Sequence, residues 1–289
     1  MSQSFTAACV QNCAVNNTDK SVTECVSLIK KAHDQGADLI CLTEFCAHLH
    51  VEEKIFETGA AAESSHPALA TFRDLAHSLS TWILVGSIAV VDQDGNKRNR
   101  SLLIDPFGEL TARYDKIHMF DVSLGDGEVY RESDTFTAGD KAVIVDTPFA
   151  RLGLTICYDL RFAALYRLLA QSGANVLTVP AAFTHTTGKA HWHVLLRARA
   201  IETGSFVFAP CQYGFHGKGR TYGHSLIIDP WGQILAEGAE DTPDVVLAEI
   251  DLQKVTEARS RIPALEHDRP LTHAEHDLLP TDKRKGATG

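Results

Sequence analysis

Residues 153–162, GLTICYDLRF, form an apolar run that ends on Cys157 and then turns abruptly polar. The apolar part predicts the end of a buried strand, and the polar part predicts a turn directly after it. Three roles are open to a cysteine at such a place: a core residue, a disulfide or metal partner, or a nucleophile. The rest of the chain has to distinguish them.

Strands and helices alternate on both sides of this stretch. The strongest predicted strands lie at 5–11, 37–45, 82–91 and 100–105, and amphipathic helices are predicted at 18–35 and 67–80. Short, mostly apolar strands such as ADLICLTEF (37–45) are typical of an α/β protein in which helices cover the sheet. The chain is therefore predicted to be α/β.

Two patterns recur in the same order in the two halves. SLLIDPFGEL (101–110) recurs as SLIIDPWGQI (225–234), and QGADLICLTEF (35–45) is echoed by SGANVLTVPAAF (172–183). The first pair predicts a hairpin turn in which proline presets φ and glycine supplies a positive φ. Two related halves, each with a mixed sheet and outer helices, predict a four-layer α-β-β-α sandwich.

No linker rich in proline, glycine or serine divides the chain. A single domain is expected over residues 1–265, and the tail at 266–289 is expected to wrap over a surface or a partner subunit. The basic run KRK (283–285) in that tail predicts a solvated segment.

Composition and charge exclude several classes of function. A net charge of −10 argues against a nucleic-acid partner, which requires a basic face. The longest apolar run, WILVGSIAVV (82–91), is about half of the ~20 residues that cross a bilayer. The first residues lack the pattern of a secretory signal, so the expected location is cytoplasmic, without membrane contact.

The cysteines do not form a recognisable framework. Seven is an odd number, and no two stand in a C-x-x-C pair, so disulfides and a structural zinc or redox site have little support. Six of the seven are predicted to be small buried apolar residues: Cys9, Cys13, Cys25, Cys41, Cys46 and Cys211.

A carboxylate accompanies Cys157 at the predicted edge of the sheets. Glu44 follows an apolar strand, whereas Ala181 occupies the matching place in the second half. Ligands bind at the carboxyl ends of strands in open α/β sheets, so Glu44 and Cys157 are expected at one rim. None of the fourteen histidines has a clear mechanistic position, and a partly buried carboxylate can replace imidazole as the base. Lys116 offers a cation, although alone it predicts only a surface lysine.

Three motifs together resemble the nitrilase, or carbon–nitrogen hydrolase, superfamily: LTEF (42–45), YDKIHMFD (114–121) and GLTICYDLRF. The resemblance covers about residues 5–265 and implies the α-β-β-α sandwich of that family. It implies that Glu44 is the general base, Lys116 the oxyanion stabiliser and Cys157 the nucleophile. No metal or organic cofactor is implied.

The resemblance extends to further site residues. YRESDTFTAGD (130–140) is similar to a family segment in which a second glutamate, here Glu132, supports the lysine and the substrate. The backbone N–H of Tyr158 is expected to be the second oxyanion donor. Relatives use the arginine of the cysteine motif, here Arg161, for a substrate carboxylate; the alternative is that Arg161 and Asp159 form an ion pair, with each other or with a neighbour, that shapes the turn.

The second half resembles one branch of the superfamily. AHWHVLLRARAIETGSFVFAPCQ (190–212) and TYGHSLIIDPWG (221–232) are similar to the branch of deaminated-glutathione amidases and ω-amidases, and more closely to the former. The loop DVSLGDGEVYRES (121–133) does not indicate a substrate. Trp192 and Trp231 are predicted to be packing residues.

The resulting prediction is a cysteine amidase that hydrolyses a linear, carboxylate-bearing small-molecule amide to an acid and ammonia through a thioester. Deaminated glutathione is the favoured substrate. An ω-amidase acting on α-ketoglutaramate, an N-carbamoyl amino acid hydrolase and a nitrilase remain alternatives, as does a non-catalytic binding or scaffold subunit. A homodimer or larger homo-oligomer is expected, and the resemblance implies that it packs through helices near Cys157.

Overall fold

The computed structural model describes residues 4–52, 55–125 and 129–273, which leaves the run at 283–285 outside the described residues. Two large mixed sheets face each other. The first has the order β19 (Asp244–Asp251), β1 (Ser4–Gln11), β2 (Leu39–Cys41), β6 (Trp82–Val91), β7 (Lys97–Ile104), β8 (Leu110–Asp115), with β5 (Ala61–Ala62) paired to β6. The second has the order β11 (Val143–Asp146), β12 (Arg151–Leu154), β13 (Val176–Thr178), β14 (Phe206–Ala209), β17 (Leu226–Ile228), β18 (Ile234–Glu237).

The two sheets repeat the same sequence of pairings. Each begins with an antiparallel edge pair, continues with parallel pairs and ends with two antiparallel pairs. Both predicted hairpin turns form, because Asp105 and Asp229 each accept two backbone N–H bonds and Gly108 and Gly232 adopt a positive φ. The prediction of two related halves is therefore confirmed.

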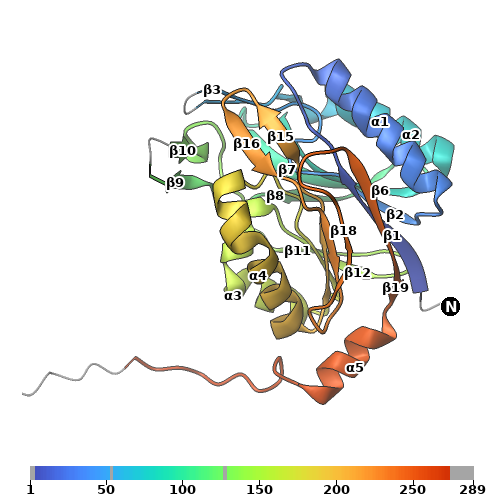
Figure 1. The fold of residues 1–289 in the computed structure, drawn as a ribbon, viewed down its shortest axis with the longest axis vertical. Coiled ribbons are helices and arrows are strands. Elements are labelled where there is room, and N and C mark those ends of the chain that lie inside the picture. Colours follow the sequence, from blue (N-terminus) through green and yellow to red (C-terminus); the bar gives the residue numbers. More distant parts are fainter. Residues whose placement is uncertain (1–3, 53–54, 126–128, 274–289) are drawn as a thin grey trace, which may run out of the picture.

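Helices cover the outer face of each sheet. Helices α1 (Thr18–Asp34) and α2 (Pro67–Leu79) lie on one side, and α3 (Ala163–Gln171) and α4 (His185–Thr203) lie on the other (Figure 1). The layers follow the order helix, sheet, sheet, helix, as predicted. Helix α5 (Gln253–Arg261) follows the last strand of the first sheet.

Strand β1 contributes side chains to two hydrophobic cores, one on each face of its sheet. Ala7 and Cys9 point toward the second sheet and join a buried cluster with Leu152. Ala8 and Val10 point the other way and pack with α1 and α2. Because successive side chains alternate between the two faces of a sheet, a continuous apolar run lets a strand bury side chains on both faces.

The sequence of α1 accounts for its bounds and its packing. Asn17 caps the start by accepting a 3.0 Å bond from the backbone N–H of Lys20. Leu28 and Ile29 are buried on the face toward the sheet, and each contributes about 1.5–3 kcal/mol through that burial. The chain leaves the helix at Gly36, whose φ of 88° suits glycine.

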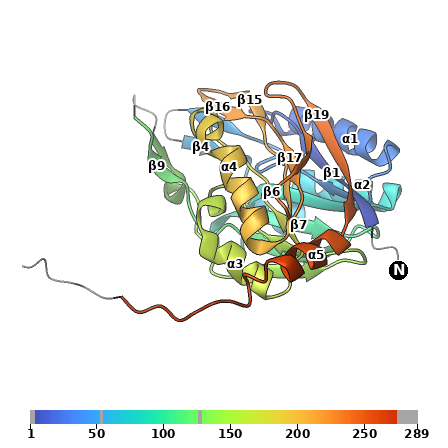
Figure 2. The same cartoon turned by 60° about the horizontal axis from the view of Figure 1, so that its bottom comes forward.

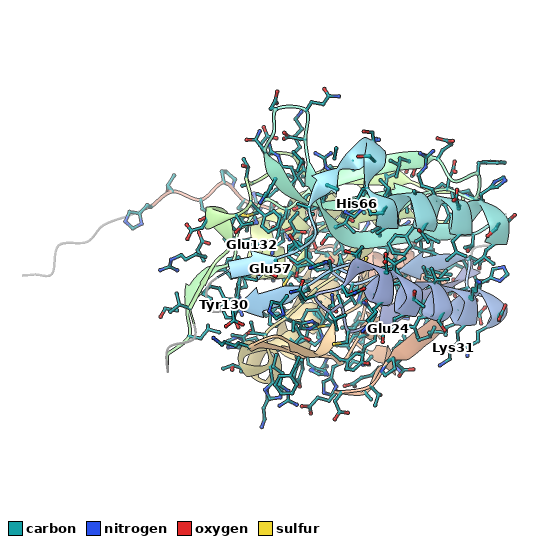
Figure 3. All side chains as sticks on the ribbon, turned by 90° about the horizontal axis from the view of Figure 1, so that it is seen from above. Glu24, Lys31, Glu57, His66, Tyr130 and Glu132 are labelled. Atoms are coloured by element: carbon teal, nitrogen blue, oxygen red, sulfur yellow. The ribbon has the colours of Figure 1, made fainter. Side chains whose placement is uncertain are left out.

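Three short hairpins lie outside the main sheets. They pair β3 (His50–Glu52) with β4 (Ile55–Glu57), β9 (Asp121–Ser123) with β10 (Val129–Arg131), and β15 (Tyr213–His216) with β16 (Gly219–Tyr222). Short 3₁₀ turns span Glu63–Ser65, Glu132–Asp134 and Cys157–Arg161. From above, Glu57 and Tyr130 lie toward the same end of the molecule, away from Lys31 of α1 (Figure 3).

The described part of the tail lies first on α3. Arg167 donates a 2.9 Å bond to the carbonyl of Ala264 and a second to Asp268. Beyond this contact the chain runs away from the body of the protein (Figure 2). That the tail at 266–289 wraps over a surface or a partner subunit stays a prediction, because residues 274–289 lie outside the described residues.

Three sequence predictions are corrected. The strand predicted at 37–45 ends at Cys41, because the chain turns there and carries Glu44 beyond the sheet. Trp231 is 56% exposed rather than packed, because its place in the hairpin turn points it outward. Cys13 is partly exposed, whereas the other cysteines are buried; all seven are free thiols.

None of the helices in the described ranges is long and apolar enough to cross a membrane.

Candidate active site

Glu44 lies in a turn just beyond β2 and is almost completely buried. The following residue, Phe45, has a φ of 50°, an uncommon conformation for a side chain of its size. Gln212 holds the turn from the second half of the chain by donating to the carbonyls of Glu44 and Phe45 at 2.8 and 3.1 Å. The hydroxyl of Ser87 accepts the N–H of Phe45 at 2.9 Å. These bonds fix the direction in which the carboxylate points.

Gly86 allows this turn to approach β6. A β-carbon at residue 86 would lie 1.9 Å from the carbonyl oxygen of Leu42 and 2.6 Å from Cβ of Pro180. Only glycine fits between these two segments, one of which leads to Glu44 and the other to the strand beside Cys157.

Cys157 begins a 3₁₀ turn shortly after the end of strand β12. Its φ of 47° lies in the left-handed region, and its N–H donates to the carbonyl of Pro180 at 2.9 Å. A strained conformation of this kind persists only where the surroundings enforce it, and such residues cluster at functional sites. The next N–H, that of Tyr158, makes no hydrogen bond within the described part of the chain and remains available as a donor.

Lys116 follows β8 and lies between two carboxylates. Its Nζ donates to Glu44 Oε1 at 2.8 Å and to Glu132 Oε1 and Oε2 at 3.0 and 2.8 Å. All three side chains are at most 3% exposed. Glu44, Lys116 and Glu132, all predicted site residues, stand in separate segments of the chain. The fold brings their side chains together with Cys157 around one cavity.

Two positioning residues had no sequence signal of their own. Asn99 on β7 donates to Glu44 Oε1 at 2.9 Å and to Glu132 Oε1 at 3.0 Å, which holds both carboxylates beside the lysine. Gln212 was equally missed. Only the pairing of strands far apart in the sequence places these amides, so a local motif could not have revealed them.

Asp159 bears on the alternative in which an ion pair shapes the turn. It is fully buried and accepts bonds from the hydroxyl of Tyr114 at 2.6 Å, the backbone N–H of Ile156 at 2.9 Å and the ring of His118 at 2.7 Å. Its ionic partner is His118, a neighbour in space, and no described contact pairs it with Arg161. Instead, Asp159 ties the turn of the cysteine to the segment that carries the lysine.

Burial and neighbouring charges shift the pKa values of Cys157, Lys116 and Glu132. Burial raises the pKa of the Cys157 thiol well above its usual value; the charge of Glu44 adds to the rise, and Lys116 opposes it. Burial disfavours the charged form of Lys116, but Glu132 and Glu44 outweigh it and raise its pKa. Burial also raises the pKa of Glu132, against the effect of Lys116. The resting site therefore holds a neutral thiol beside a charged ammonium.

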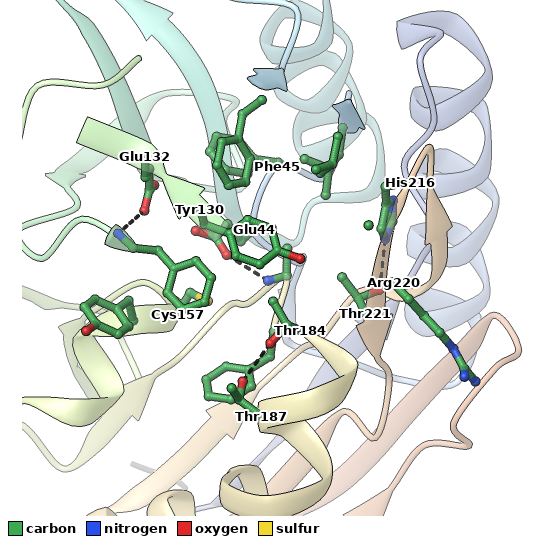
Figure 4. A pocket seen from close by; sticks show the side chains of 18 of the residues that line it. Glu44, Phe45, Tyr130, Glu132, Cys157, Thr184, Thr187, His216, Arg220 and Thr221 are labelled. Atoms are coloured by element: carbon green, nitrogen blue, oxygen red, sulfur yellow. Dashed lines mark hydrogen bonds between the residues drawn. The ribbon is translucent and has the colours of Figure 1, made fainter. Parts of the chain in front are cut away.

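These groups line a narrow cavity that is partly open to solvent. Tyr130 and Phe120 form part of the apolar wall, and Thr184 and Thr187 add hydroxyl groups from the start of α4. Figure 4 shows Glu44, Glu132 and Cys157 on one side of the cavity, while Arg220 on β16 extends outward at the other. The reactive groups are thus buried and the far end is charged.

Arg161 lies behind the wall of the cavity and does not line it. Its guanidinium is 5.8 Å from the ring centre of Tyr158 and 5.5 Å from that of Phe183, two rings that do line it. Its NH1 is 3.3 Å from Nδ1 of His191. No described contact links Arg161 to the buried cluster.

An α-β-β-α sandwich with a buried carboxylate, ammonium and thiol at one rim defines a hydrolytic enzyme of the nitrilase type. The model of the carbon-nitrogen hydrolase family matches residues 6–260. The chain belongs to this family.

Individual relatives agree with this assignment. The chain is 44% identical over 269 residues to a deaminated glutathione amidase of Synechocystis, with 91% of this chain and 97% of that protein covered. It is 40% identical to a deaminated glutathione amidase of Yersinia enterocolitica, with 91% and 92% covered. The crystal structure of the Caenorhabditis elegans NitFhit protein superimposes with a TM-score of 0.82 at 32% identity, over 92% of this chain and 65% of that one.

Proposed function

We propose that this chain is a cysteine amidase that hydrolyses a linear, carboxylate-bearing amide through a thioester, with deaminated glutathione as the favoured substrate. The observation that carries the proposal is the buried cluster of Glu44, Lys116 and Cys157 at the cavity. The similarity to deaminated glutathione amidases over nearly the whole chain supports the substrate.

In the proposed reaction, Glu44 removes the proton of Cys157 as sulfur attacks the amide carbonyl. The raised pKa of the thiol requires proton removal to accompany the attack, because little thiolate exists beforehand. The oxyanion is held between the ammonium of Lys116 and the N–H of Tyr158. Since the three bonds of Nζ already go to the two carboxylates, one of those to Glu132 has to lengthen as the oxyanion forms.

Glu44 then protonates the leaving nitrogen, and the acyl group remains on Cys157 as a thioester. Glu44 next activates a water molecule that releases the acid and regenerates the thiol. The leaving group is ammonia when the substrate is a primary amide. The amides of deaminated glutathione are N-substituted, so its leaving group is a peptide amine, and the predicted release of ammonia does not apply to this substrate.

We propose Arg161 as the group that binds the substrate carboxylate, with Arg220 as the competing candidate. Arg161 can swing from its position on two cavity-lining rings, and its planar fork suits a bidentate contact. Arg161→Lys should raise KM for a carboxylate-bearing amide and leave a neutral amide of similar length unaffected. Arg220→Lys tests the competing candidate, which lines the cavity but already donates to Glu240 at 3.0 Å; a larger rise of KM in this variant than in Arg161→Lys would favour Arg220. Equal losses for both substrates in Arg161→Lys would contradict this role.

A homodimer through α3 and α4 is part of the proposal. Leu168 on α3 and Val194 and Ile201 on α4 are 52%, 68% and 54% exposed, and Trp231 adds apolar surface. Apolar side chains gathered on one side of a protein mark an interaction surface. Light scattering at micromolar concentration should give the mass of at least two chains, and a monomer would contradict it.

The seven free thiols support the proposed cytoplasmic location, since such a compartment keeps cysteines reduced.

The substrate is tested by comparing two compounds at equal enzyme concentration. Release of cysteinylglycine from deaminated glutathione should proceed with a higher kcat/KM than release of ammonia from α-ketoglutaramate. The opposite order would identify an ω-amidase. No turnover of either, with Cys157 intact, would favour the scaffold alternative.

A further inference from the structure

A second cluster of chemically reactive side chains lies outside the catalytic cavity. His193 comes from α4, His224 follows β16, and Glu237 ends β18. His193 Nε2 is 3.0 Å and His224 Nδ1 is 2.7 Å from the same oxygen, Glu237 Oε1. One ligand atom from each residue lies within 4.8 Å of those of the other two. Three separate elements therefore aim two imidazoles and one carboxylate at a single point.

The backbone of His224 is fixed in an unusual conformation. Its φ of 52° lies in the left-handed region, which residues with a β-carbon seldom adopt. Its carbonyl accepts a 2.8 Å bond from the indole N–H of the buried Trp192, and its N–H donates to Ala239 at 3.2 Å. The imidazole is thus held in place by the core and not only by Glu237. A strained, enforced position is the kind of outlier that accompanies binding sites.

The set of donor atoms suits one type of cation. Zinc and similar divalent transition metals bind imidazole nitrogen and carboxylate oxygen at about 2.0–2.2 Å. Here the nitrogens already approach the oxygen more closely than tetrahedral ligands of one ion do, so binding needs only small side-chain rotations. The three side chains are 29%, 21% and 38% exposed, which leaves room for water to complete the coordination.

We propose that His193, His224 and Glu237 form a binding site for one zinc-like divalent cation. The ion takes the place of the proton that now bridges each imidazole to Glu237, and each neutral ring then carries its one proton on its other nitrogen after exchange with solvent. It links α4 to the segment after β16 and to β18, and both α4 and β16 contribute side chains to the cavity wall. The ion therefore stabilises the fold around the active site, and the amide chemistry of Cys157 does not use it.

The chain contains a closely matched control. His185 lies on the same helix, its Nε2 is 3.0 Å from Glu240 Oε1, and its side chain is also 29% exposed. It has no second imidazole at the same carboxylate oxygen, and Arg220 donates to that oxygen instead. His185→Gln thus removes an equivalent histidine–glutamate pair without touching the proposed site.

The test uses the full chain without a polyhistidine tag, stripped of metal by a chelator. Titration with cobalt(II), followed by its visible absorption, should show one equivalent bound per chain, and zinc should displace it. His193→Gln and Glu237→Gln should each weaken binding by at least the ~10–100-fold that loss of an outer partner costs. His185→Gln should leave the affinity within about threefold. Zinc should raise Tm of wild type and of His185→Gln only, because a ligand of the native state stabilises it.

Melting of the metal-free variants checks that each is folded. Should Glu237→Gln fail to fold, His193→Gln decides alone, because the side chain of His193 is partly exposed and lies outside the buried core. Absence of a cobalt spectrum in the wild type would overturn the proposal. So would equal weakening by His185→Gln and His193→Gln, which would indicate non-specific binding to surface histidines.

Discussion

Replacing Lys116 by methionine removes one charge from the centre of the site while keeping most of the side-chain volume. Two buried carboxylates, Glu44 and Glu132, then face each other without the cation that lies 2.8 Å from both. Breaking a buried pair in this way costs about 3–5 kcal/mol of stability. Loss of the proposed oxyanion donor should lower kcat by about 100–1000-fold.

The variant should also change how stability depends on pH. Burial already raises the pKa of Glu132, and without Lys116 it rises further. A carboxyl group whose folded pKa exceeds its unfolded value binds its proton more tightly in the native state. Stability is therefore retained below the unfolded pKa and lost as pH rises through the folded pKa. Urea unfolding of Lys116→Met should give a larger deficit at high pH than at low pH, relative to wild type.

The double variant Lys116→Met/Glu132→Gln separates the two effects. It removes the second carboxylate, so stability should largely return, whereas kcat should stay low because the donor is still missing. Steady-state release of product amine gives kcat, and urea titrations give the free energy of unfolding. A variant that kept kcat and changed only KM would refute the role of Lys116 in the transition state.

Three further changes test other parts of the account. Gly86→Ala should lower both Tm and activity, because its β-carbon would overlap the carbonyl of Leu42; full activity would show that this close approach is dispensable. Asp159→Asn should cost about 1–3 kcal/mol, since buried donors such as the hydroxyl of Tyr114 lose a charged acceptor; unchanged urea unfolding would speak against it. Val194→Asp should yield monomers in light scattering, and persistent dimers would locate the interface elsewhere.

The sequence predicted the layered fold because its periodic patterns are local. Apolar strands, helix ends and the two Asp-Pro turns each depend on a few neighbouring residues, and the repeat of these patterns indicated two related sheets. The prediction failed where tertiary contacts decide. The strand predicted to reach Glu44 ends early, because a hydrogen bond to the hydroxyl of Ser87 and one from the amide of Gln212 hold a turn there instead.

The reactive residues of the site were predictable, but the residues that position them were not. Glu44, Lys116 and Cys157 stand in recognisable motifs, whereas Asn99 acts through strand pairing across the sheet. An ion pair of Asp159 that shapes the turn was one alternative, but its partners Tyr114 and His118 stand at the end of another strand. Local spacing cannot show such contacts.

The central claim is that Cys157 is the nucleophile, and turnover by Cys157→Ala tests it most directly. The account predicts less than a thousandth of the wild-type rate of amine release, with unchanged melting, because only the reacting sulfur is lost. Cys13→Ala, which removes a partly exposed thiol, should keep the wild-type rate. Retention of a tenth of the wild-type rate by Cys157→Ala would contradict the account.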